Sequence, residues 1–377
     1  MHFPLLVWEQ RKLEDVAKII GGGTPSTKIK EYWNGNINWY APIEIGNQTF
    51  VSSSRKKISE LGLKKSSAKL LPGGKTILFT SRAGIGDMAI MKTDGSTNQG
   101  FQSWVVRSNL ADVYFLYSLG KKLKKQALRK ASGSTFLEIS NSEVKKLLLF
   151  IPSFSEQKDI SKVFKLIDKL ISLQQRKLKL FDQLRKTLLE YLISEQKIPI
   201  VRFNSFRKEW KVFRLQNLII KTTKGKAKAD MVGNRSIYLD TAYLNGGALS
   251  TVDAPTDVYK DDIVILWDGS LAGKVYHGFS GALGSTLKSF TPKYSGEYLF
   301  QYLQRSQEKI FKNYRTPNIP HVVKDFITIF KVNAPSLEEQ NKISTILESI
   351  DLLIDNQNTK IKKWKKIKEH LLQKMFI

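Results

Sequence analysis

Two glycine-rich stretches are the first places where this chain could do chemistry, because glycine lets backbone amides approach a phosphate closely. One is Gly21–Gly23, and the other is "PGGKT" at residues 72–76. A dinucleotide fingerprint needs G-x-G-x-x-G, and no glycine stands at position 26. A Walker motif needs a glycine separated by four residues from Gly-Lys-Thr, and position 69 is Lys. The sequence therefore predicts that neither stretch is a nucleotide site.

Other catalytic constellations are also weak. The four histidines are scattered without metal-ligand spacing; they are His2, His277, His321 and His370. The Asn-Pro-Pro-aromatic and Asp-Pro-Pro-aromatic signatures of amino-methyltransferases are absent, and so is any cysteine nucleophile. We therefore expect recognition rather than catalysis, with no catalytic residue, no metal site and no cofactor.

Composition limits where such a protein works. The chain has 377 residues and no cysteine, which excludes disulfides and thiolate zinc sites and suits a cytoplasmic protein. No apolar run reaches the roughly 18 residues of a membrane span. The start, "MHFPLLVW", lacks the basic and apolar regions of a signal peptide. We expect a cytoplasmic protein with no membrane partner.

Charge is the first functional clue. The chain carries 61 Lys and Arg against 34 Asp and Glu, a net charge of +27, and every segment of it is basic. A spread basic surface suits nucleic acid, whose phosphates attract it through release of counterions. A lysine-rich organism with a generally basic proteome would give the same excess, so charge alone leaves both explanations open.

A long repeat organises the chain. Residues 152–171 align with residues 335–354 at a shift of 183 without gaps, and ten of the 20 positions are identical. Apolar residues then recur in steps of three, four and seven, which predicts an amphipathic helix of about 40 residues, or about 60 Å, in each copy. Ser153 and Ser336 are predicted N-caps, and Glu156 and Glu339 would complete capping boxes.

Such a narrow apolar seam is not buried by one helix alone. Two matching helices are expected to pack on each other as a coiled coil. The alternative is that each helix covers its own neighbouring domain. The predicted seam consists of Ile160, Phe164, Ile167, Ile171, Phe181, Leu188, Ile343, Leu347, Ile350, Ile354, Trp364 and Leu371.

A weaker repeat precedes each helix. "WEQRKLEDV" at 8–16 resembles "WKVFRLQNL" at 210–218. "ILFTSRAGIG" at 77–86 parallels "VILWDGSLAG" at 264–273, and both of these segments are predicted to form a strand followed by a turn. We predict an α+β fold with approximate internal two-fold symmetry. Its parts are a domain at 1–151, a helix at 152–196, a domain at 197–334 that begins with a linker, and a helix at 335–377. The two globular halves otherwise differ strongly, as expected if they recognise different things.

These features together resemble the specificity subunits of type I restriction–modification systems. The resemblance rests on "GGGTPSTKIKEYWNGNINWY" at 21–40, "NQGF" at 98–101, and the "PSFSEQ" and "PSLEEQ" starts of the two helices. It covers essentially the whole chain. One departure is that the second half has "TTKGKAKADM" at 222–231, without Gly-Gly-Thr-Pro, in place of the glycine-rich turn.

The resemblance implies a function and a set of partners. Such subunits have two target-recognition domains, each reading one half of an asymmetric, split DNA sequence. Their two helices form an antiparallel coiled coil that spaces the domains and docks two adenine-N6 methyltransferase subunits, which restriction subunits join. The specificity subunit is not catalytic, and S-adenosylmethionine, ATP and Mg would be bound by the partner subunits. The glycine-rich stretch would then be a turn in a recognition domain.

Residues that meet DNA should be basic, amide or hydroxyl groups on turns. In the first domain the candidates are Thr24, Ser26, Lys28, Ser81, Arg82, Asn98, Gln99, Ser134 and Thr135. In the second domain they are Lys224, Lys226, Lys228, Ser270, Lys274, Lys288, Arg315 and Thr316. The aromatic residues Trp39, Tyr40 and Trp267 could stack on bases, but core packing is the simpler explanation.

Two other functions compete with this hypothesis. A stand-alone two-headed regulator would bind a DNA sequence without a methyltransferase. A fragment of a fused restriction–methylation enzyme would need catalytic motifs, which the sequence lacks. A DNA-mimicking inhibitor should be acidic, and the charge of +27 argues against it.

Overall fold

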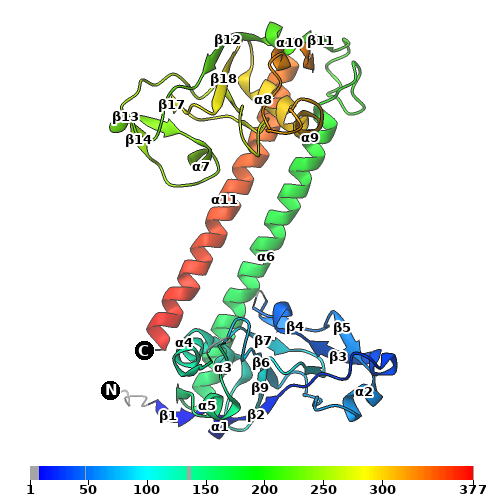
Figure 1. Ribbon diagram of the computed structural model, residues 1–377, viewed down its shortest axis with the longest axis vertical. Coiled ribbons are helices and arrows are strands. Elements are labelled where there is room, and N and C mark those ends of the chain that lie inside the picture. Colours follow the sequence, from blue (N-terminus) through cyan, green and yellow to red (C-terminus); the bar gives the residue numbers. More distant parts are fainter. Residues whose placement is uncertain (1–7, 47, 134–136, 377) are drawn as a thin grey trace. The chain divides into compact units, whose positions relative to one another are not determined.

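The computed structural model describes residues 8–46, 48–133 and 137–376 (Figure 1). The chain divides into two compact units. Unit 1 comprises Met1–Leu173 and Ile361–Ile377, and unit 2 comprises Gln174–Lys360. Both divisions fall inside the two long helices, α6 (Phe154–Leu192) and α11 (Leu337–Met375), which have 39 residues each. Each unit therefore contains one globular domain and a part of both helices.

Unit 1 is built from ten strands and five short helices among its described residues. The strands are β1 (Glu9–Lys12), β2 (Ala17–Gly21), β3 (Trp33–Tyr40), β4 (Phe50–Val51), β5 (Lys56–Ile58), β6 (Thr76–Phe79), β7 (Met88–Met91), β8 (Gly95–Thr97), β9 (Gln102–Val106) and β10 (Leu148–Ile151). The helices are α1 (Leu13–Val16), α2 (Glu60–Lys64), α3 (Val113–Ser118), α4 (Gly120–Lys130) and α5 (Asn141–Lys145), with 3₁₀ turns at Lys30–Tyr32 and Pro42–Glu44.

Unit 2 has a similar inventory. Its strands are β11 (Lys211–Arg214), β12 (Ile219–Lys224), β13 (Val232–Leu239), β14 (Thr251–Val252), β15 (Ile263–Leu266), β16 (Val275–Tyr276), β17 (Ala282–Leu283), β18 (Leu287–Pro292) and β19 (Lys331–Ala334). Its helices are α7 (Thr241–Leu244), α8 (Gly296–Arg305), α9 (Gln307–Asn313) and α10 (Phe326–Ile329), with a 3₁₀ turn at Leu215–Leu218.

The sheets of the two units share one strand order, except that β4 of unit 1 has no counterpart among the described strands of unit 2. The order β2-β9-β6-β7-β4 in unit 1 corresponds to β12-β18-β15-β16 in unit 2, and β5-β3-β8 corresponds to β14-β13-β17. Even an irregularity is repeated, because the register shifts between Trp33 and Ile37 in β3 and between Val232 and Ser236 in β13. The predicted repeat of the globular halves is therefore present throughout the sheets.

The repeat also corrects one sequence alignment. Ile77 of β6 pairs with Trp104, and Ile263 of β15 pairs with Phe290, so these strands correspond at a shift of 186 rather than the predicted 187. After the turn the predicted shift holds, because Gly86 donates to the carbonyl of Thr80 as Gly273 donates to that of Leu266. The turn of unit 2 is thus one residue longer.

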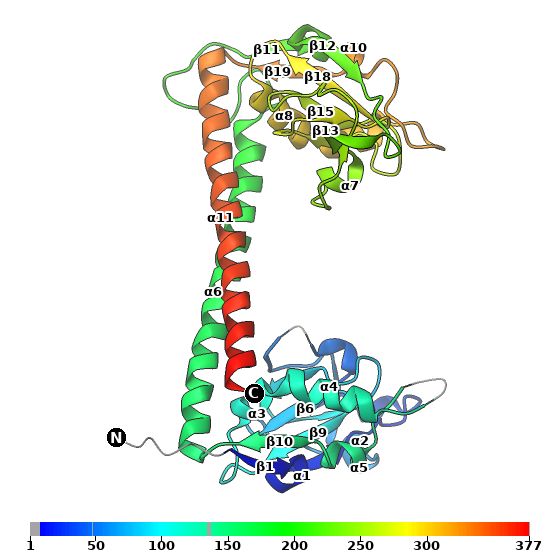
Figure 2. The ribbon, with the colours of Figure 1, turned by 90° about the vertical axis from the view of Figure 1, so that its left-hand side faces the viewer.

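Each unit has one main apolar core beneath its sheet. In unit 1, Phe79, Trp104 and Phe115 are buried with the α6 residues Phe164 and Ile167. In unit 2, Ile265, Phe290 and Tyr302 are buried with Leu192 of α6 and Leu347 of α11. Figure 2 shows α3 and α4 beside β6 and β9, and α8 beside β15. Each helix does therefore cover its own domain, as one alternative predicted.

The long helices also pack on each other, and within each unit they run antiparallel. In unit 1 the ring centroids of Phe164 and Phe376 lie 5.9 Å apart, and farther along α6 Asp168 accepts a 2.6 Å bond from Lys368 Nζ. In unit 2 Gln357 Nε2 donates to Gln174 O at 2.9 Å, and Arg185 Nε donates to Asp351 at 2.7 Å. The predicted antiparallel direction is confirmed in each unit.

The ion pairs obey the sequence repeat. The shift of 183 relates Asp168 to Asp351 and Arg185 to Lys368, so the ion pair of one unit corresponds to that of the other.

Of the twelve predicted seam residues, six are buried and six are partly buried, and none is exposed. The buried ones are Ile160, Phe164, Ile167, Ile171, Ile343 and Leu347, and the partly buried ones are Phe181, Leu188, Ile350, Ile354, Trp364 and Leu371.

The starts of the helices match half of the prediction. Ser153 Oγ accepts from the amide of Glu156 at 3.3 Å, and Ser336 Oγ accepts from that of Glu339 at 3.4 Å, as N-caps do. The glutamates do not complete the predicted capping boxes. Glu156 accepts from Trp8 Nε1 at 3.3 Å and Glu339 from Trp210 Nε1 at 3.4 Å. The carboxylates instead connect each long helix to the first strand segment of its own domain.

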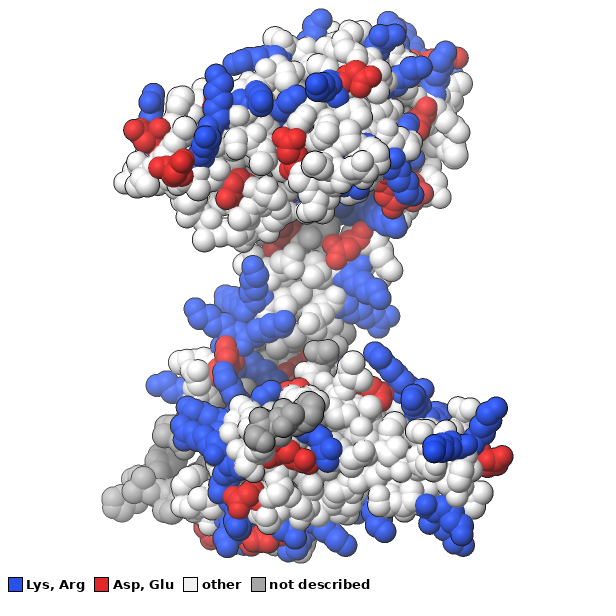
Figure 3. Space-filling view, in the orientation of Figure 1, with Lys and Arg blue, Asp and Glu red and all other residues white. Residues whose placement is uncertain are grey.

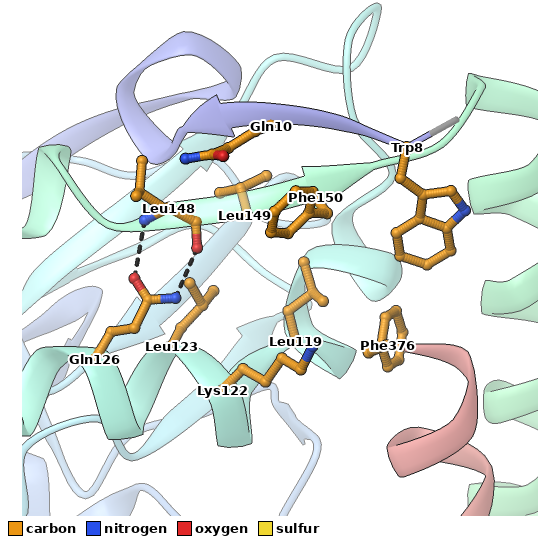
Figure 4. Close-up of a pocket in the computed structure, with 10 residues that line it drawn as sticks. All are labelled: Trp8, Gln10, Leu119, Lys122, Leu123, Gln126, Leu148, Leu149, Phe150 and Phe376. Atoms are coloured by element: carbon orange, nitrogen blue, oxygen red, sulfur yellow. Dashed lines mark hydrogen bonds between the residues drawn. The ribbon is translucent and has the colours of Figure 1, made fainter. Parts of the chain in front are cut away.

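A cavity of about 250 Å³ in unit 1 lies where the end of α11 meets β1, β10 and α4 (Figure 4). Phe376 packs against Trp8 with ring centroids 5.8 Å apart. Gln126 uses both ends of its amide on the backbone of Leu148, at 2.7 and 3.0 Å. Apolar side chains form most of the wall, so we interpret the cavity as a packing gap at the junction of helix and domain.

Candidate nucleic-acid interface

The amides of Gly22 and Gly23 in unit 1 are not free to cradle a phosphate. Gly22 N donates to Phe101 O at 3.4 Å, and Gly23 N donates to Thr97 O at 2.8 Å. The carbonyl of Gly23 is also engaged, because Trp39 Nε1 donates to it at 2.9 Å. The prediction that this stretch is a turn and not a nucleotide loop therefore has a physical basis.

Close backbone packing explains why glycine stands there. A Cβ atom on Gly22 would lie 1.8 Å from the carbonyl oxygen of Asn98. In unit 2 a Cβ atom on Gly225 would lie 1.9 Å from the carbonyl oxygen of Gly284. The shift of 186 that relates β9 to β18 also relates Asn98 to Gly284. Gly225 is thus the counterpart of Gly22, although the second half lacks the Gly-Gly-Thr-Pro motif.

Backbone hydrogen bonds join four loops into one scaffold in unit 1. Besides the glycine turn and residues 97–101, Ser81 N donates to Gly100 O at 2.8 Å, and Ile139 N donates to Ser81 O at 3.0 Å. The loops that carry candidates from distant parts of the sequence therefore meet on one region of the domain. We call this region, formed by residues 21–28, 80–87, 97–102 and 137–141, the loop platform.

Unit 2 repeats the loop platform bond for bond. Gly225 N donates to Leu287 O at 3.0 Å, Trp267 N donates to Thr286 O at 2.8 Å, and Val322 N donates to Trp267 O at 2.9 Å. Its platform comprises residues 224–231, 266–274, 283–288 and 315–324. These main-chain bonds are thus the same in both domains, while the side chains that the platforms carry differ.

Most candidates of unit 1 lie on the platform and reach the surface. Lys28, Ser26 and Gln99 are exposed, and Thr24 donates its hydroxyl proton to Gln99 Oε1. Asn98 Oδ1 accepts from Gly100 N at 2.8 Å. The guanidinium of Arg82 is half exposed and pairs with Glu138 at 3.1 Å.

Three candidates of unit 1 need a correction or lie outside the described residues. Ser81 is fully buried, and its main chain bonds Gly100 on one neighbouring loop and Ile139 on another. Its hydroxyl therefore does not lie at the surface, and the prediction of a direct contact is corrected for it. Ser134 and Thr135 lie outside the described residues. Trp39, Tyr40 and Trp267 are buried, which confirms core packing for these aromatic residues.

Lysines dominate the platform of unit 2. Lys224 at the end of β12 is exposed, and so are Lys226 and Lys228 on the loop that follows it. Lys224 pairs in register with Lys288 across β12 and β18, and Lys288 Nζ lies 3.3 Å from the centroid of the Trp267 ring. Like charges directly opposite each other on a sheet repel. Such a pair favours an anion nearby.

The environment of Lys288 predicts an unusual titration. Burial, and then repulsion by Lys224, lower the pKa of Lys288, while Asp268 acts in the opposite direction. We expect Lys224→Ala to raise the pKa of Lys288 toward that of an ordinary lysine, and Asp268→Asn to lower it further. A pH titration of the Lys288 side chain by NMR measures both changes. An unchanged pKa in Lys224→Ala would show that the two ammonium groups do not interact.

The remaining candidates of unit 2 are largely engaged in the fold. Arg315 donates to the carbonyls of Phe311 at 3.0 Å and Ser270 at 3.1 Å, and Lys274 donates to Asn245 at 2.5 Å. Thr316 donates to Ile319 O at 2.5 Å, whereas Ser270 is exposed. Arg315, Lys274 and Thr316 thus shape the platform.

The charge of the sequence appears on the surface of both units. Figure 3 shows Lys and Arg side chains spread over the visible face of each unit, with fewer Asp and Glu among them. On the basic helix α4, Lys121, Lys124 and Lys130 are paired with carboxylates at 2.5, 2.6 and 3.0 Å. Part of the positive charge of this helix is therefore used in ion pairs within the protein.

Sequence reasoning missed Gln102, the residue of unit 1 at the position of Lys288. Gln102 pairs in register with Gly21 as Lys288 pairs with Lys224. Aligning "QSWVV" of β9 with "LKSFTP" of β18 on Ser103 and Ser289 would have related the two positions. Gln102 stands only four positions after the candidate Asn98, but its place in a strand concealed it.

Comparison with known proteins identifies the family of this architecture. The family described as type I restriction modification DNA specificity domain matches residues 7–180 and 207–366, one match in each half of the chain. The chain belongs to this family. The resemblance seen in the sequence is confirmed, and each globular domain with its repeated platform corresponds to one match.

Named relatives agree with this membership. The type I restriction enzyme MjaIX specificity subunit of Methanocaldococcus jannaschii is 33% identical over 246 residues, which cover 62% of this chain and 56% of the relative. The MjaVIII specificity subunit of the same organism is 35% identical over 179 residues, 45% of this chain and 42% of the relative. The chain spans about half the length of the curated relatives it matches.

A solved structure shows the same fold. The crystal structure of a type I restriction–modification system S subunit from M. genitalium covers 100% of this chain and 98% of its own, with a TM-score of 0.68 and 16% identity. The predicted α+β fold with two globular domains and two long helices is therefore confirmed. None of the described helices is long and apolar enough to cross a membrane.

Proposed function

We propose that this chain is the DNA sequence-recognition subunit of a type I restriction–modification complex, in which each globular domain reads one half of an asymmetric two-part site. One observation carries the proposal beyond family membership: the two loop platforms share their backbone bonds and differ in their side chains. Phosphate contacts position a protein on DNA and base-edge contacts specify the sequence. A fixed platform with variable side chains suits that division of tasks.

The long helices and the partners complete the proposal. The helices set the distance between the two half-sites and dock two adenine-N6 methyltransferase subunits, which restriction and translocase subunits join. This chain itself is non-catalytic, and the partner subunits bind S-adenosylmethionine, ATP and Mg. The antiparallel pairing of α6 and α11 within each unit supports a spacer role.

Arg82 provides a test in the first domain. It lies on the turn after β6, and its guanidinium is half exposed beside Glu138. We expect Arg82→Ala to weaken DNA binding and to lower the slope of affinity against salt by about 1 if the residue contacts a phosphate, or to change the selected sequence if it contacts a base. Binding assays on duplex DNA at several salt concentrations measure this. If the DNA affinity, its salt dependence and the selected sequence are all unchanged, Arg82 does not contact the DNA.

The proposal is tested by isolating the chain with its methyltransferase partner and selecting duplexes from a random-sequence library. The expected result is a complex of both subunits that selects one motif with two specific parts and a fixed gap. If the chain selects a motif alone and never retains a methyltransferase, a stand-alone regulator is the better description. If it binds DNA with no sequence preference, the recognition function is wrong.

A further inference from the structure

The side chain of Gln102 is held in a way that suits base reading. Asn141 Nδ2 donates a 2.7 Å bond to Gln102 Oε1, and both residues are partly buried. This bond fixes which end of the Gln102 amide is the oxygen. Within the described part of the chain, Gln102 Nε2 makes no hydrogen bond to protein, and Oε1 has a second lone pair. Both N–H groups of Nε2 and one lone pair of Oε1 are therefore left for a ligand.

Gly21 keeps this amide accessible. Gly21 is the cross-strand neighbour of Gln102, and a Cβ atom on it would lie 3.6 Å from Oε1 and 3.9 Å from Nε2. A longer side chain at position 21 would therefore lie against the amide. In unit 2 the corresponding residue is Lys224, which does lie close to its neighbour Lys288.

The position belongs to the loop platform. Gln102 directly follows residues 97–101, which bond the glycine turn on one side and Ser81 on the other. The same position of the platform carries an amide in unit 1 and an ammonium group on a tryptophan ring in unit 2. A position that keeps its place in the backbone and changes its chemistry is what two domains with different half-sites require.

We propose that Gln102 reads an adenine through the major groove in the half-site bound by the first domain, and that Asn141 is a positioning residue for its amide. Adenine presents an acceptor at N7 and a donor at N6, the complement of one amide N–H and one amide oxygen. Guanine, the other purine, presents two acceptors, N7 and O6, at its major-groove edge and so does not match this donor and acceptor. The inference rests on the proposed function and adds to it a residue and a base.

The test uses the full chain in complex with its methyltransferase partner and a library of random duplexes. We expect Gln102→Ala to lower the enrichment of adenine at one position of one half-site by about tenfold, and to leave the other half-site unchanged. Gln102→Glu, whose carboxylate only accepts, should shift that position toward cytosine, which offers a donor at N4. The unchanged half-site is an internal control for folding and assembly.

Asn141 is tested by reversing its bond. In Asn141→Asp the carboxylate accepts from Gln102 Nε2, so the amide turns its oxygen outward. Adenine enrichment at the same position should fall although Gln102 is intact, which a purely structural role would not produce. Asn141→Gln retains an amide donor, so its enrichment of adenine at that position should be higher than that of Asn141→Asp.

The outcomes separate two failures. If the wild-type complex selects no two-part motif, the proposed function is wrong and this inference falls with it. If the wild type selects such a motif and Gln102→Ala returns it unchanged at every position, only the inference is overturned. A loss of affinity with a lower salt slope and an unchanged motif would make Gln102 a phosphate contact and would also overturn it.

Discussion

Alanine in place of Gly22 or Gly225 is expected to lower the free energy of unfolding of its own unit by about 3 kcal/mol. The new Cβ atom would lie 1.8 Å from the Asn98 carbonyl oxygen in one case and 1.9 Å from that of Gly284 in the other. The nearest clashing atom is a backbone oxygen in both variants, so the clash is relieved only if the glycine turn moves away from the loop to which it is hydrogen-bonded. Urea unfolding followed by tryptophan fluorescence measures the loss.

Gly21→Ala is the matched control for this prediction. A Cβ atom on Gly21 meets Gln102 only at 3.6 Å, an ordinary van der Waals distance. We expect a change of less than about 0.5 kcal/mol in the unfolding free energy. If Gly22→Ala is as stable as Gly21→Ala, the loop platform is more adaptable than its hydrogen bonds indicate.

The second large effect is expected for Glu339→Gln. Glu339 is only 1% exposed and accepts two 2.8 Å bonds from Arg202, whose side chain is 13% exposed. The substitution leaves a buried guanidinium without its counter-charge, which costs about 3 kcal/mol. Unit 2 should therefore unfold at a lower urea concentration than in the wild type.

Two variants control for this ion pair. Glu156→Gln changes the counterpart in unit 1, whose carboxylate accepts from Trp8 and has no ion-pair partner among the described residues, so a loss of about 1 kcal/mol is expected. Arg202→Met combined with Glu339→Gln should be milder than Glu339→Gln alone, because no unpaired charge remains. Equal losses in Glu156→Gln and Glu339→Gln would contradict the role given to Arg202.

The sequence predicted the long helices well because their signal is periodic and repeated. The seam residues and the N-cap serines follow from a pattern that extends over 39 residues per helix, whereas the antiparallel direction was implied by the family resemblance. The capping boxes failed because a tertiary contact competes: Trp8 and Trp210 are distant in sequence and take the carboxylates that a local box would use.

The interface was harder to predict, because its residues meet through backbone bonds between distant loops. Ser81 looked like a surface residue on a polar turn, yet it is buried where its main chain bonds two neighbouring loops of the platform. Gln102 looked like an ordinary strand residue, and only its register with Gly21 and its bond to Asn141 distinguish it. The Gly22–Gly225 correspondence is a matter of space rather than of motif, so sequence comparison alone could not establish it.

The most direct test of the account is a map of N6-methyladenine in a bacterial host without other adenine methylation, expressing this chain with its methyltransferase partner. The account predicts methylation at one asymmetric motif, made of two specific parts with a fixed gap, that disappears when this chain is omitted. Methylation at a single contiguous motif, or the same methylation without this chain, would contradict the claim that its two domains specify the site.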